Sequence, residues 1–226
     1  AIRNTSFKER SAKLKSIETW LMDHKEDIRS AMHQDYRKPA PEVDITELWA
    51  ALNEIRHIRR YLKKWMRPKK VKSTLTMATA EAWIQYEPKG VVLIITPWNF
   101  PFNLTISPLI SAIAAGNCAV IKPSELTPNS SKVIAKMVND LFKEEEVALF
   151  EGDSNVAEAL LDEPFNHIFF TGSPKIGSSV MEKAAKHLST ITLELGGKSP
   201  TIVDETANLK DAAQKISWGK FLNCGQ

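Results

Sequence analysis

The stretch of sequence that decides the fold is GVVLIITPWNFPFNLTISPLISAIAAGNCAVI, which runs from Gly90 to Ile121 and carries no charged side chain. It is longer than the ~20 apolar residues that a membrane-spanning helix needs. However, Pro97, Pro101 and Pro108, together with several asparagines, would leave broken backbone and unpaired amides in a bilayer. The sequence therefore predicts buried elements of a globular protein here, and not a membrane span.

This uncharged stretch divides into a strand, a helix and a second strand. Residues 91–95 (VVLII) and 118–121 (CAVI) are short apolar runs rich in β-branched side chains. Between them, residues 104–115 are apolar over the length of a helix and end at Gly116. Strands that are apolar on both faces are typical of a parallel sheet with helices on both sides.

The downstream sequence continues this alternation of strands and helices. Asn129 and Ser130 are N-cap candidates before an apolar helical stripe at 133–141. The further elements that we expect are strands at 147–150, 167–170, 191–193 and 201–203, and helices at 155–161, 174–187 and 209–222. The pattern predicts the α/β class, with a doubly wound, mostly parallel sheet and helices on both of its faces.

The first 88 residues predict amphipathic helices. Ser6 and Glu9 form a capping-box pattern, and Leu14, Ile17 and Leu21 follow at helical spacing. A second, longer helical pattern begins after residue 41, and its apolar stripe consists of Leu48, Leu52, Ile55, Ile58, Leu62 and Trp65. The segment at 71–87 is expected to be extended and exposed.

Composition and charge narrow the class of protein. The chain has 226 residues, of which 43% are hydrophobic and 25% charged, and this balance excludes a disordered, collagen-like or disulfide-rich protein. The formal net charge of +3 does not favour a polyanionic partner. Lys and Arg cluster between Arg56 and Lys72. Because Trp65 is assigned to the apolar stripe, only Tyr61 is left for base stacking. We therefore interpret the cluster as a solvated helix face and expect no nucleic-acid partner.

Cys118 and Cys224 are the only cysteines of the sequence. Neither belongs to a Cys-x-x-Cys or Cys/His metal spacing, so no metal site is predicted, and both are interpreted as small packing residues. Two thiols in a chain of this length fit a reducing compartment, which favours a cytoplasmic protein. Residues 1–10 contain no apolar segment typical of a secretory signal.

Four loops that follow predicted strands carry the chemically interesting residues, and ligands of open α/β sheets bind outside the carboxyl ends of strands. In TPWNFP (96–101), two prolines stiffen the backbone around Asn99, whose amide could donate a hydrogen bond to an oxyanion. In KPSE (122–125), Lys122 and Glu125 suit the hydroxyls of a ribose. The alternatives are a turn-forming asparagine and a surface ion pair.

The other two loops contain glycines. In FTGSPKIG (170–177), a turn leads into a helix with Pro174 in its first position, and the N–H groups of that helix would favour a phosphate. The G-x-x-x-x-G spacing is neither the G-x-G-x-x-G dinucleotide fingerprint nor a P-loop, and a plain helix-initiating turn is the alternative. In LELGGKSP (193–200), desolvation between leucines would raise the pKa of Glu194 toward that of a general base. A solvent-facing glutamate is the alternative there.

In this order, the four loops resemble the aldehyde dehydrogenase superfamily, and most of all its class 3 branch of fatty and aromatic aldehyde dehydrogenases. The match spans 87–226 through PWNFP, KPSE, FTGSxxxG and LELGGKSP, followed by WGKFLNCGQ. The resemblance implies a Rossmann-like NAD(P)-binding domain at 89–194, on which N-terminal helices at 1–66 pack. It also implies an extended bridging or oligomerisation segment at 67–88 and the beginning of a second, α/β catalytic domain at 195–226.

The resemblance also implies roles for single residues. Glu194 would be the general base, and Asn99 would help to form the oxyanion hole. The cofactor would be NAD, with NADP left open. The residues expected to contact it are Trp98, Lys122, Glu125, Gly172, Ser173, Gly177 and Leu195.

The family's reaction oxidises an aldehyde to an acid through a cysteine thiohemiacetal and a thioester. Its nucleophile ends the signature N-x-G-Q-x-C and is expected two positions after Gln226, whereas Cys224 occupies the variable x position. The alternative is a non-catalytic nucleotide-binding relative or a truncated, inactive fragment. The resemblance implies a small-molecule aldehyde as substrate and a homodimer, and it leaves open a C-terminal membrane tail.

Overall fold

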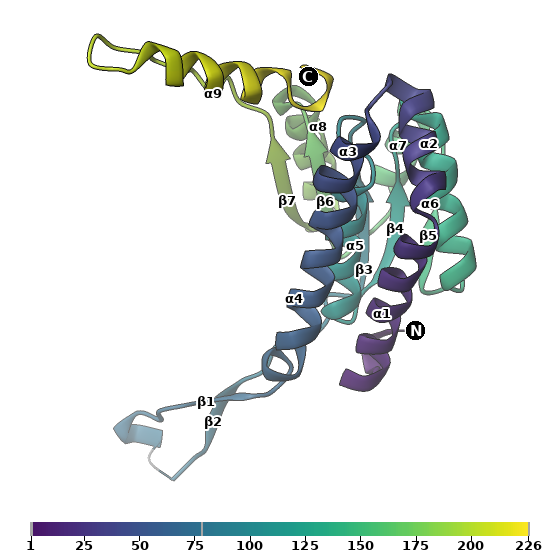
Figure 1. The fold of residues 1–226 in the computed structure, drawn as a ribbon. Coiled ribbons are helices and arrows are strands. Elements are labelled where there is room, and N and C mark those ends of the chain that lie inside the picture. The colour runs from purple at the N-terminus through teal and green to yellow at the C-terminus, as the bar shows by residue number, and fades with distance from the viewer. Residues whose placement is uncertain (1, 78, 226) are drawn as a thin grey trace.

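The computed structural model describes residues 2–77 and 79–225, and within this part the chain forms a five-stranded parallel sheet (Figure 1). The strand order is β5-β4-β3-β6-β7. The strands are β3 (Val91–Ile95), β4 (Cys118–Lys122), β5 (Val147–Leu149), β6 (His167–Gly172) and β7 (Thr190–Leu195). Each neighbouring pair is parallel, which confirms the predicted α/β class and its sheet.

Helices cover both faces of this sheet. The helices between its strands are α5 (Asn103–Ala114), α6 (Pro128–Leu141), α7 (Ser154–Leu161) and α8 (Pro174–Lys186). Successive side chains of β3 point to opposite faces. Val92 and Ile94 therefore join the core that includes α5 and α6, whereas Leu93 and Ile95 join a second core with α7 and α8. The predicted strand-helix-strand unit at 91–121 is confirmed.

The N-terminal helices form a further layer outside α5 and α6. They are η1 (Ile2–Asn4), α1 (Phe7–Asp23), α2 (Lys25–Tyr36), α3 (Ala40–Val43), the π-helix η2 (Asp44–Trp49) and α4 (Ala50–Trp65). The predicted capping box is confirmed, because Ser6 and Glu9 bond reciprocally at the start of α1. Helix α2 was not predicted as a separate helix.

Two details of the predicted helices are wrong. Helix α6 begins at Pro128, one residue before the expected N-cap at Asn129 and Ser130, because Asp35 of α2 accepts hydrogen bonds from both of their backbone N–H groups. Trp65 is 46% exposed, whereas the other stripe residues of the second helical pattern are buried. It continues an exposed row of aromatic rings at i, i+4 spacing with His57 and Tyr61.

The exposure of Trp65 removes one argument from the sequence analysis. Base stacking at the basic cluster was predicted to be absent because Trp65 was expected to be buried, and the exposed Trp65 ring does not support this reason. The cluster is nevertheless partly paired, since Arg56 and Arg59 hydrogen-bond to Glu18 of α1 and Lys70 bonds to Glu81. The absence of a nucleic-acid partner stays a prediction.

The segment after α4 forms a hairpin that extends away from the body of the molecule (Figure 1). Strand β1 (Lys69–Val71) pairs antiparallel with β2 (Ala82–Ile84), and η3 (Leu75–Met77) lies between them. The side chains of Trp83, Ile84 and Tyr86 are exposed here. Apart from η3, the prediction of an exposed, extended segment at 71–87 is therefore confirmed for the described residues, and Ala78 lies outside them.

After β7 the chain leaves the sheet. The strand expected at 201–203 is wrong, since these residues have no strand partner among those described, and Ile202 is 88% exposed. An isolated strand would leave its backbone groups unpaired. Helix α9 (Leu209–Phe221) follows, has no buried side chain and projects from the body, and η4 (Asn223–Gly225) comes last. No helix in the described ranges has the length and apolar character needed to cross a membrane.

Candidate active site

Asn99 lies in the loop between β3 and α5. Its side-chain Oδ1 accepts a hydrogen bond from the Phe100 N–H at 3.1 Å. Its backbone carbonyl accepts one from Tyr36 Oη at 3.2 Å and one from Asn223 Nδ2 at 3.0 Å. The loop is thus held by residues that are distant in sequence. Trp98, directly before it, is 37% exposed, and its ring stands edge-on to that of Tyr36.

Lys122, the last residue of β4, forms an ion pair with Glu125 in the loop that follows. The Lys122 side chain is buried, and its Nζ donates to Glu125 Oε2 and to the Pro123 carbonyl, both at 2.9 Å. Burial alone would raise the pKa of Glu125, but hydrogen bonds from backbone and Lys122, together with the Lys122 charge, hold that pKa below its ordinary value. Glu125 is therefore an anion at neutral pH, at the strand end where the sequence analysis expected a ribose.

The start of α8 is built as the sequence predicts. Ser173 is the N-cap, its Oγ accepts from the Ile176 N–H, and a proline holds the first helical position. A Cβ on Gly172 would lie 2.5 Å from Phe170 Cζ, and one on Gly177 would lie 2.8 Å from Leu195 Cδ2. Both glycines therefore allow a close approach of backbone to neighbouring side chains. The helix dipole favours an anion at this end.

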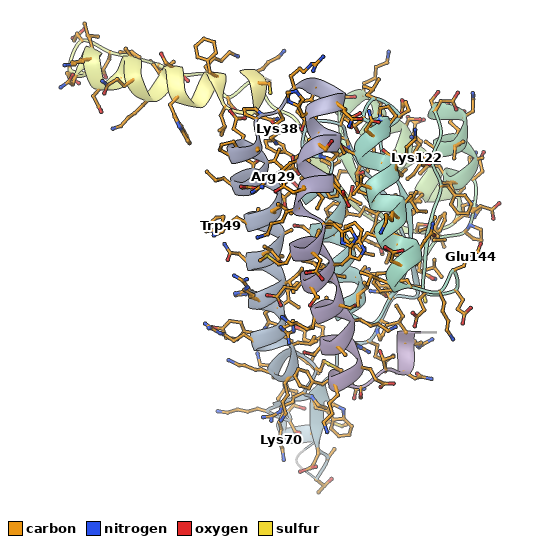
Figure 2. All side chains as sticks on the ribbon, turned by 45° about the vertical axis from the view of Figure 1, so that its right-hand side comes forward. Arg29, Lys38, Trp49, Lys70, Lys122 and Glu144 are labelled. Atoms are coloured by element: carbon orange, nitrogen blue, oxygen red, sulfur yellow. The ribbon has the colours of Figure 1, made fainter. Side chains whose placement is uncertain are left out.

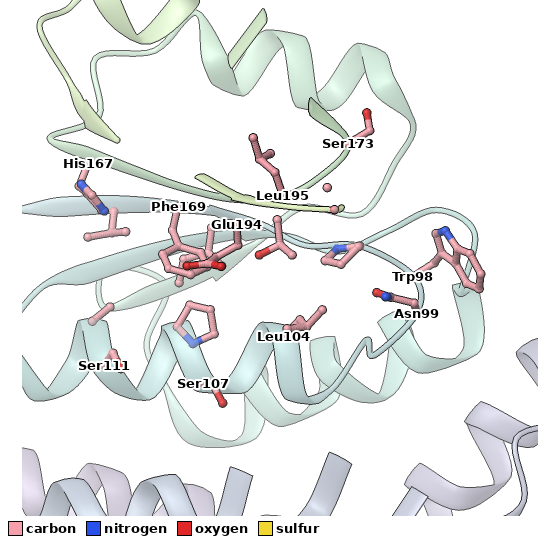
Figure 3. A pocket seen from close by; sticks show the side chains of 18 of the residues that line it. Trp98, Asn99, Leu104, Ser107, Ser111, His167, Phe169, Ser173, Glu194 and Leu195 are labelled. Atoms are coloured by element: carbon pink, nitrogen blue, oxygen red, sulfur yellow. The ribbon is translucent and has the colours of Figure 1, made fainter. Parts of the chain in front are cut away.

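Glu194 and Leu195 end strand β7 and point to opposite faces of the sheet. In the register with β6, Glu194 lies beside Thr171 and Leu195 beside Gly172. Leu195 therefore meets the α8 side, whereas Glu194 faces α5 (Figure 3). Glu194 is exposed in this chain, which agrees with the solvent-facing alternative and not with desolvation between the leucines. The reason is that β7 is an edge strand with no further strand beside it in the described sheet.

One cavity of about 800 Å³ brings most of these residues together (Figure 3). The predicted site residues that line it are Trp98, Asn99, Gly172, Ser173, Glu194 and Leu195. Lys122, Glu125 and Gly177 lie outside its lining. Apolar side chains of the sheet and of α5, such as Ile94, Leu104 and Phe169, also line it. The N-terminus of α8, the Asn99 amide and the Glu194 carboxylate therefore lie around the same cavity.

The structure adds polar residues that the sequence analysis missed. Thr171 lines the cavity, and its buried Oγ1 has no hydrogen-bond partner in the described structure. At the far end, both ring nitrogens of His167 contact threonine hydroxyls, those of Thr190 and Thr192. Burial, and then the charge of Lys89, lower the pKa of His167. Thr171 stands in the FTGSxxxG motif, which could have pointed to it. No sequence pattern marks His167 and its two threonine partners, because only the β6–β7 register brings them together.

Both cysteines, Cys118 and Cys224, are free thiols in the structure. Cys224 is exposed and has a φ of 58°, so the prediction that it is a buried packing residue is wrong. Partial burial, and then the negative charge of Glu42, raise the pKa of its thiol, which disfavours a nucleophilic thiolate. Cys118 is half-buried and packs against the core. Gln226, the last residue of the WGKFLNCGQ motif, lies outside the described residues.

Comparison with known proteins identifies the family of this chain. Over residues 1–226 the chain matches the aldehyde dehydrogenase family, and it belongs to that family. It is 49% identical over 226 residues to AldX of Bacillus subtilis strain 168, whose name assigns it to the aldehyde dehydrogenases, covering 100% of this chain and 51% of the relative. It is 42% identical to mouse aldehyde dehydrogenase family 3 member B2, covering 99% and 46%. The resemblance to class 3 is thereby confirmed, and the chain spans about half the length of these relatives.

Solved structures of relatives share the fold. The substrate-bound state of Staphylococcus aureus AldH superposes with a TM-score of 0.95 at 42% identity, covering 98% of this chain and 48% of that one. An NADP-dependent enzyme of Escherichia coli superposes with a TM-score of 0.89 at 30% identity, covering 99% and 46%. PnpE in complex with nicotinamide adenine dinucleotide has the same TM-score at 28% identity, covering 100% and 46%.

Proposed function

We propose that this chain supplies the cofactor-binding part of an enzyme that oxidises an aldehyde to a carboxylic acid with NAD(P)+. The observation that supports the proposal most is the shared cavity. It is lined at once by Asn99, by Glu194 and by the residues that begin α8. A module that only binds nucleotides has no need of an oxyanion donor and a base beside the nucleotide site.

The residues at the start of α8 fit a dinucleotide. The backbone at Gly172 and Gly177 leaves no room for a Cβ, and Ser173 caps a helix whose first turn attracts phosphate. In the proposal, Gly172, Ser173 and Gly177 hold the pyrophosphate, and Trp98 and Leu195 flank the nicotinamide. Bound NAD(P)+ would supply the hydride acceptor of the reaction.

Lys122 and Glu125 are proposed to bind the adenosine ribose. The two side chains already bond to each other, so the carboxylate is fixed near the strand end. Because Glu125 is ionised at neutral pH, it would repel the 2′-phosphate of NADP. The proposal therefore favours NAD over NADP.

The chemical steps divide between two side chains of this chain and one expected nucleophile. A cysteine two positions after Gln226 would add to the aldehyde carbonyl, and the Asn99 amide would stabilise the oxyanion of the resulting thiohemiacetal. After loss of hydride from this adduct, a thioester remains. Glu194 would then take a proton from water, and the hydroxide would release the acid. The substrate is proposed to be a small-molecule aldehyde and the assembly a homodimer.

The test uses the full-length protein with an aldehyde and either NAD+ or NADP+. We expect reduced nicotinamide and carboxylic acid to form in equal amounts, with the higher kcat/KM for NAD+. Nucleotide binding without turnover of any carbonyl compound would contradict the proposal. It would leave a non-catalytic nucleotide-binding relative as the explanation.

A further inference from the structure

The loop that carries Asn99 is contacted along three consecutive residues by the chain at the end of α2. The Tyr36 ring meets Trp98 edge-on with centroids 6.4 Å apart, and Tyr36 Oη donates to the Asn99 carbonyl at 3.2 Å. Lys38 Nζ lies 4.4 Å from the centroid of the Phe100 ring, within the range of a cation–π contact. Tyr36 therefore contacts Trp98 and Asn99, and Lys38 contacts Phe100.

A left-handed turn makes this double contact feasible. Arg37, which ends α2, has a φ of 62° and an exposed side chain. The turn stops the helix between Tyr36 and Lys38, so both neighbours of Arg37 can face the loop. Lys38 is 0% exposed, which is rare for a lysine unless its charge is paired.

The partner of Lys38 is Glu47, on the π-helix η2. The Lys38 Nζ to Glu47 Oε1 distance is 2.8 Å, and both side chains are fully buried. Trp49, two residues further on, is exposed and points outward (Figure 2). The other carboxylate oxygen of Glu47 accepts from the Asn103 N–H at 2.8 Å, at the start of α5. Burial raises the pKa of Glu47, and this outweighs the lowering by Lys38 and by the backbone donors.

Glu47 also replaces a helix cap that the local sequence lacks. The N-cap of α5 is Phe102, whose side chain cannot accept a hydrogen bond from the first turn. The ion pair therefore holds the Asn99 loop from both sides, at Phe100 through Lys38 and at Asn103 through Glu47. For stability alone, an apolar pair of similar volume would serve as well as a buried ion pair. The pair is better explained by the position of the loop that it holds.

We propose that Lys38, Glu47 and Tyr36 are positioning residues that fix the Asn99 amide for the oxidation of the aldehyde. The inference rests on the proposed function. An oxyanion donor works only when it is held in place before the charge develops, and a displacement of 1 Å can cost about a hundredfold in rate.

The test is a double-mutant cycle in the full-length enzyme. One arm is the double variant Lys38→Met/Glu47→Gln, which removes both charges and keeps an acceptor for the Asn103 N–H. The other arm is Asn99→Ala. We expect Lys38→Met/Glu47→Gln to lower kcat roughly tenfold to hundredfold while the KM for NAD+ stays within about twofold. In the Asn99→Ala background, the same change should lower kcat by less than about twofold further.

Two matched controls separate positioning from stability. Lys13→Met breaks the ion pair between Lys13 Nζ and Glu146 Oε1, 2.7 Å apart and remote from the loop, and should lower the thermal midpoint without changing kcat. Tyr36→Phe removes only the hydroxyl that bonds to the Asn99 carbonyl, so it provides a second test if the charge-free variant does not fold. Its control is Tyr61→Phe on the exposed face of α4.

The possible outcomes distinguish failure of the positioning role from failure of the proposed function. Equal losses of kcat with and without Asn99, in an enzyme that is active before mutation, would overturn the positioning role and leave the proposed function intact. A loss of thermal stability with unchanged kcat would overturn it in the same way. If the unmutated full-length protein oxidises no aldehyde, the proposed function fails, and the positioning role fails with it.

Discussion

Leu195, the last residue of β7, packs against Gly177 in the first turns of α8 so closely that a Cβ on Gly177 would lie 2.8 Å from Leu195 Cδ2. The contact joins two residues that are 18 positions apart in sequence and that the sequence analysis assigned to the same cofactor. It sets how near the first turn of α8 comes to the strand end.

Gly177→Ala should therefore weaken cofactor binding. The added methyl group would displace Leu195, which the proposal places beside the nicotinamide, and we expect a roughly fivefold rise in the KM for NAD+, equivalent to about 1 kcal/mol. Global stability should change little, because the overpacking cost of about 1 kcal/mol is offset by the better helix propensity of alanine, also about 1 kcal/mol. Steady-state kinetics with varied NAD+ measure the effect. Gly219→Ala in α9 is the control, since its Cβ would meet no atom within 4 Å, and an unchanged KM in Gly177→Ala would contradict the prediction.

Glu194→Gln should slow release of the acid in the full-length enzyme by about a hundredfold or more, because the amide cannot take a proton from water. The first turnover of NAD+ should persist as a burst of reduced cofactor, since the base acts after hydride loss. Rapid-mixing absorbance measurements separate the two phases. Unchanged steady-state turnover would remove Glu194 from the mechanism.

Asp35→Ala should destabilise the packing of α2 on α6. The Asp35 carboxylate accepts hydrogen bonds from the N–H groups of Asn129 and Ser130 at 3.0 and 2.8 Å. A side chain of α2 thus caps the first turn of α6. Loss of a helix cap costs about 1–2 kcal/mol of the free energy of unfolding. Urea denaturation measures it. Asp35→Asn, which keeps one side-chain oxygen as acceptor, should lose less, and equal stability of Asp35→Ala and the parent would show that the cap contributes nothing.

Glu18 should make the free energy of unfolding depend on pH in the acid range. It accepts from Arg56, Arg59 and Lys15, and its side chain is only 8% exposed. Burial alone would raise the pKa of Glu18, but hydrogen bonds from Arg56 and Lys15 and their charges keep it below the ordinary 4.5. A carboxyl whose pKa is lowered on folding stabilises the fold above the unfolded-state pKa, and this contribution is lost as the pH falls through the folded-state pKa.

The matching experiment compares Glu18→Gln with the parent protein by urea denaturation between neutral and acid pH. Near neutral pH we expect the variant to be less stable by about 1–3 kcal/mol. The difference should stay constant down to roughly pH 5 and shrink below that value. A difference that is the same at every pH would show that the charge of Glu18 is not what stabilises the contact between α1 and α4.

Patterns that act over a few residues predicted the elements correctly. The apolar runs of β3 and β4, and the capping box of Ser6 and Glu9, depend on neighbours in the chain, and the structure confirms them. Trp65, the helix start at Asn129 and the strand at 201–203 were predicted wrongly. In each case the outcome depends on what another element covers, caps or pairs with.

The features of the candidate site likewise separate into those that the sequence predicted and those that only the tertiary structure decided. The sequence alone determined the α/β class, the family and the order of the four loops, because each of these follows from residues that are close together in the chain. The tertiary structure alone decided that Asn99 and Glu194 line one cavity, and that Glu194 and Cys224 are exposed. It also decided that Lys38 and Glu47 meet in the interior. Sheet register and helix packing set these relationships through burial between residues distant in the chain, and no local pattern contains that information.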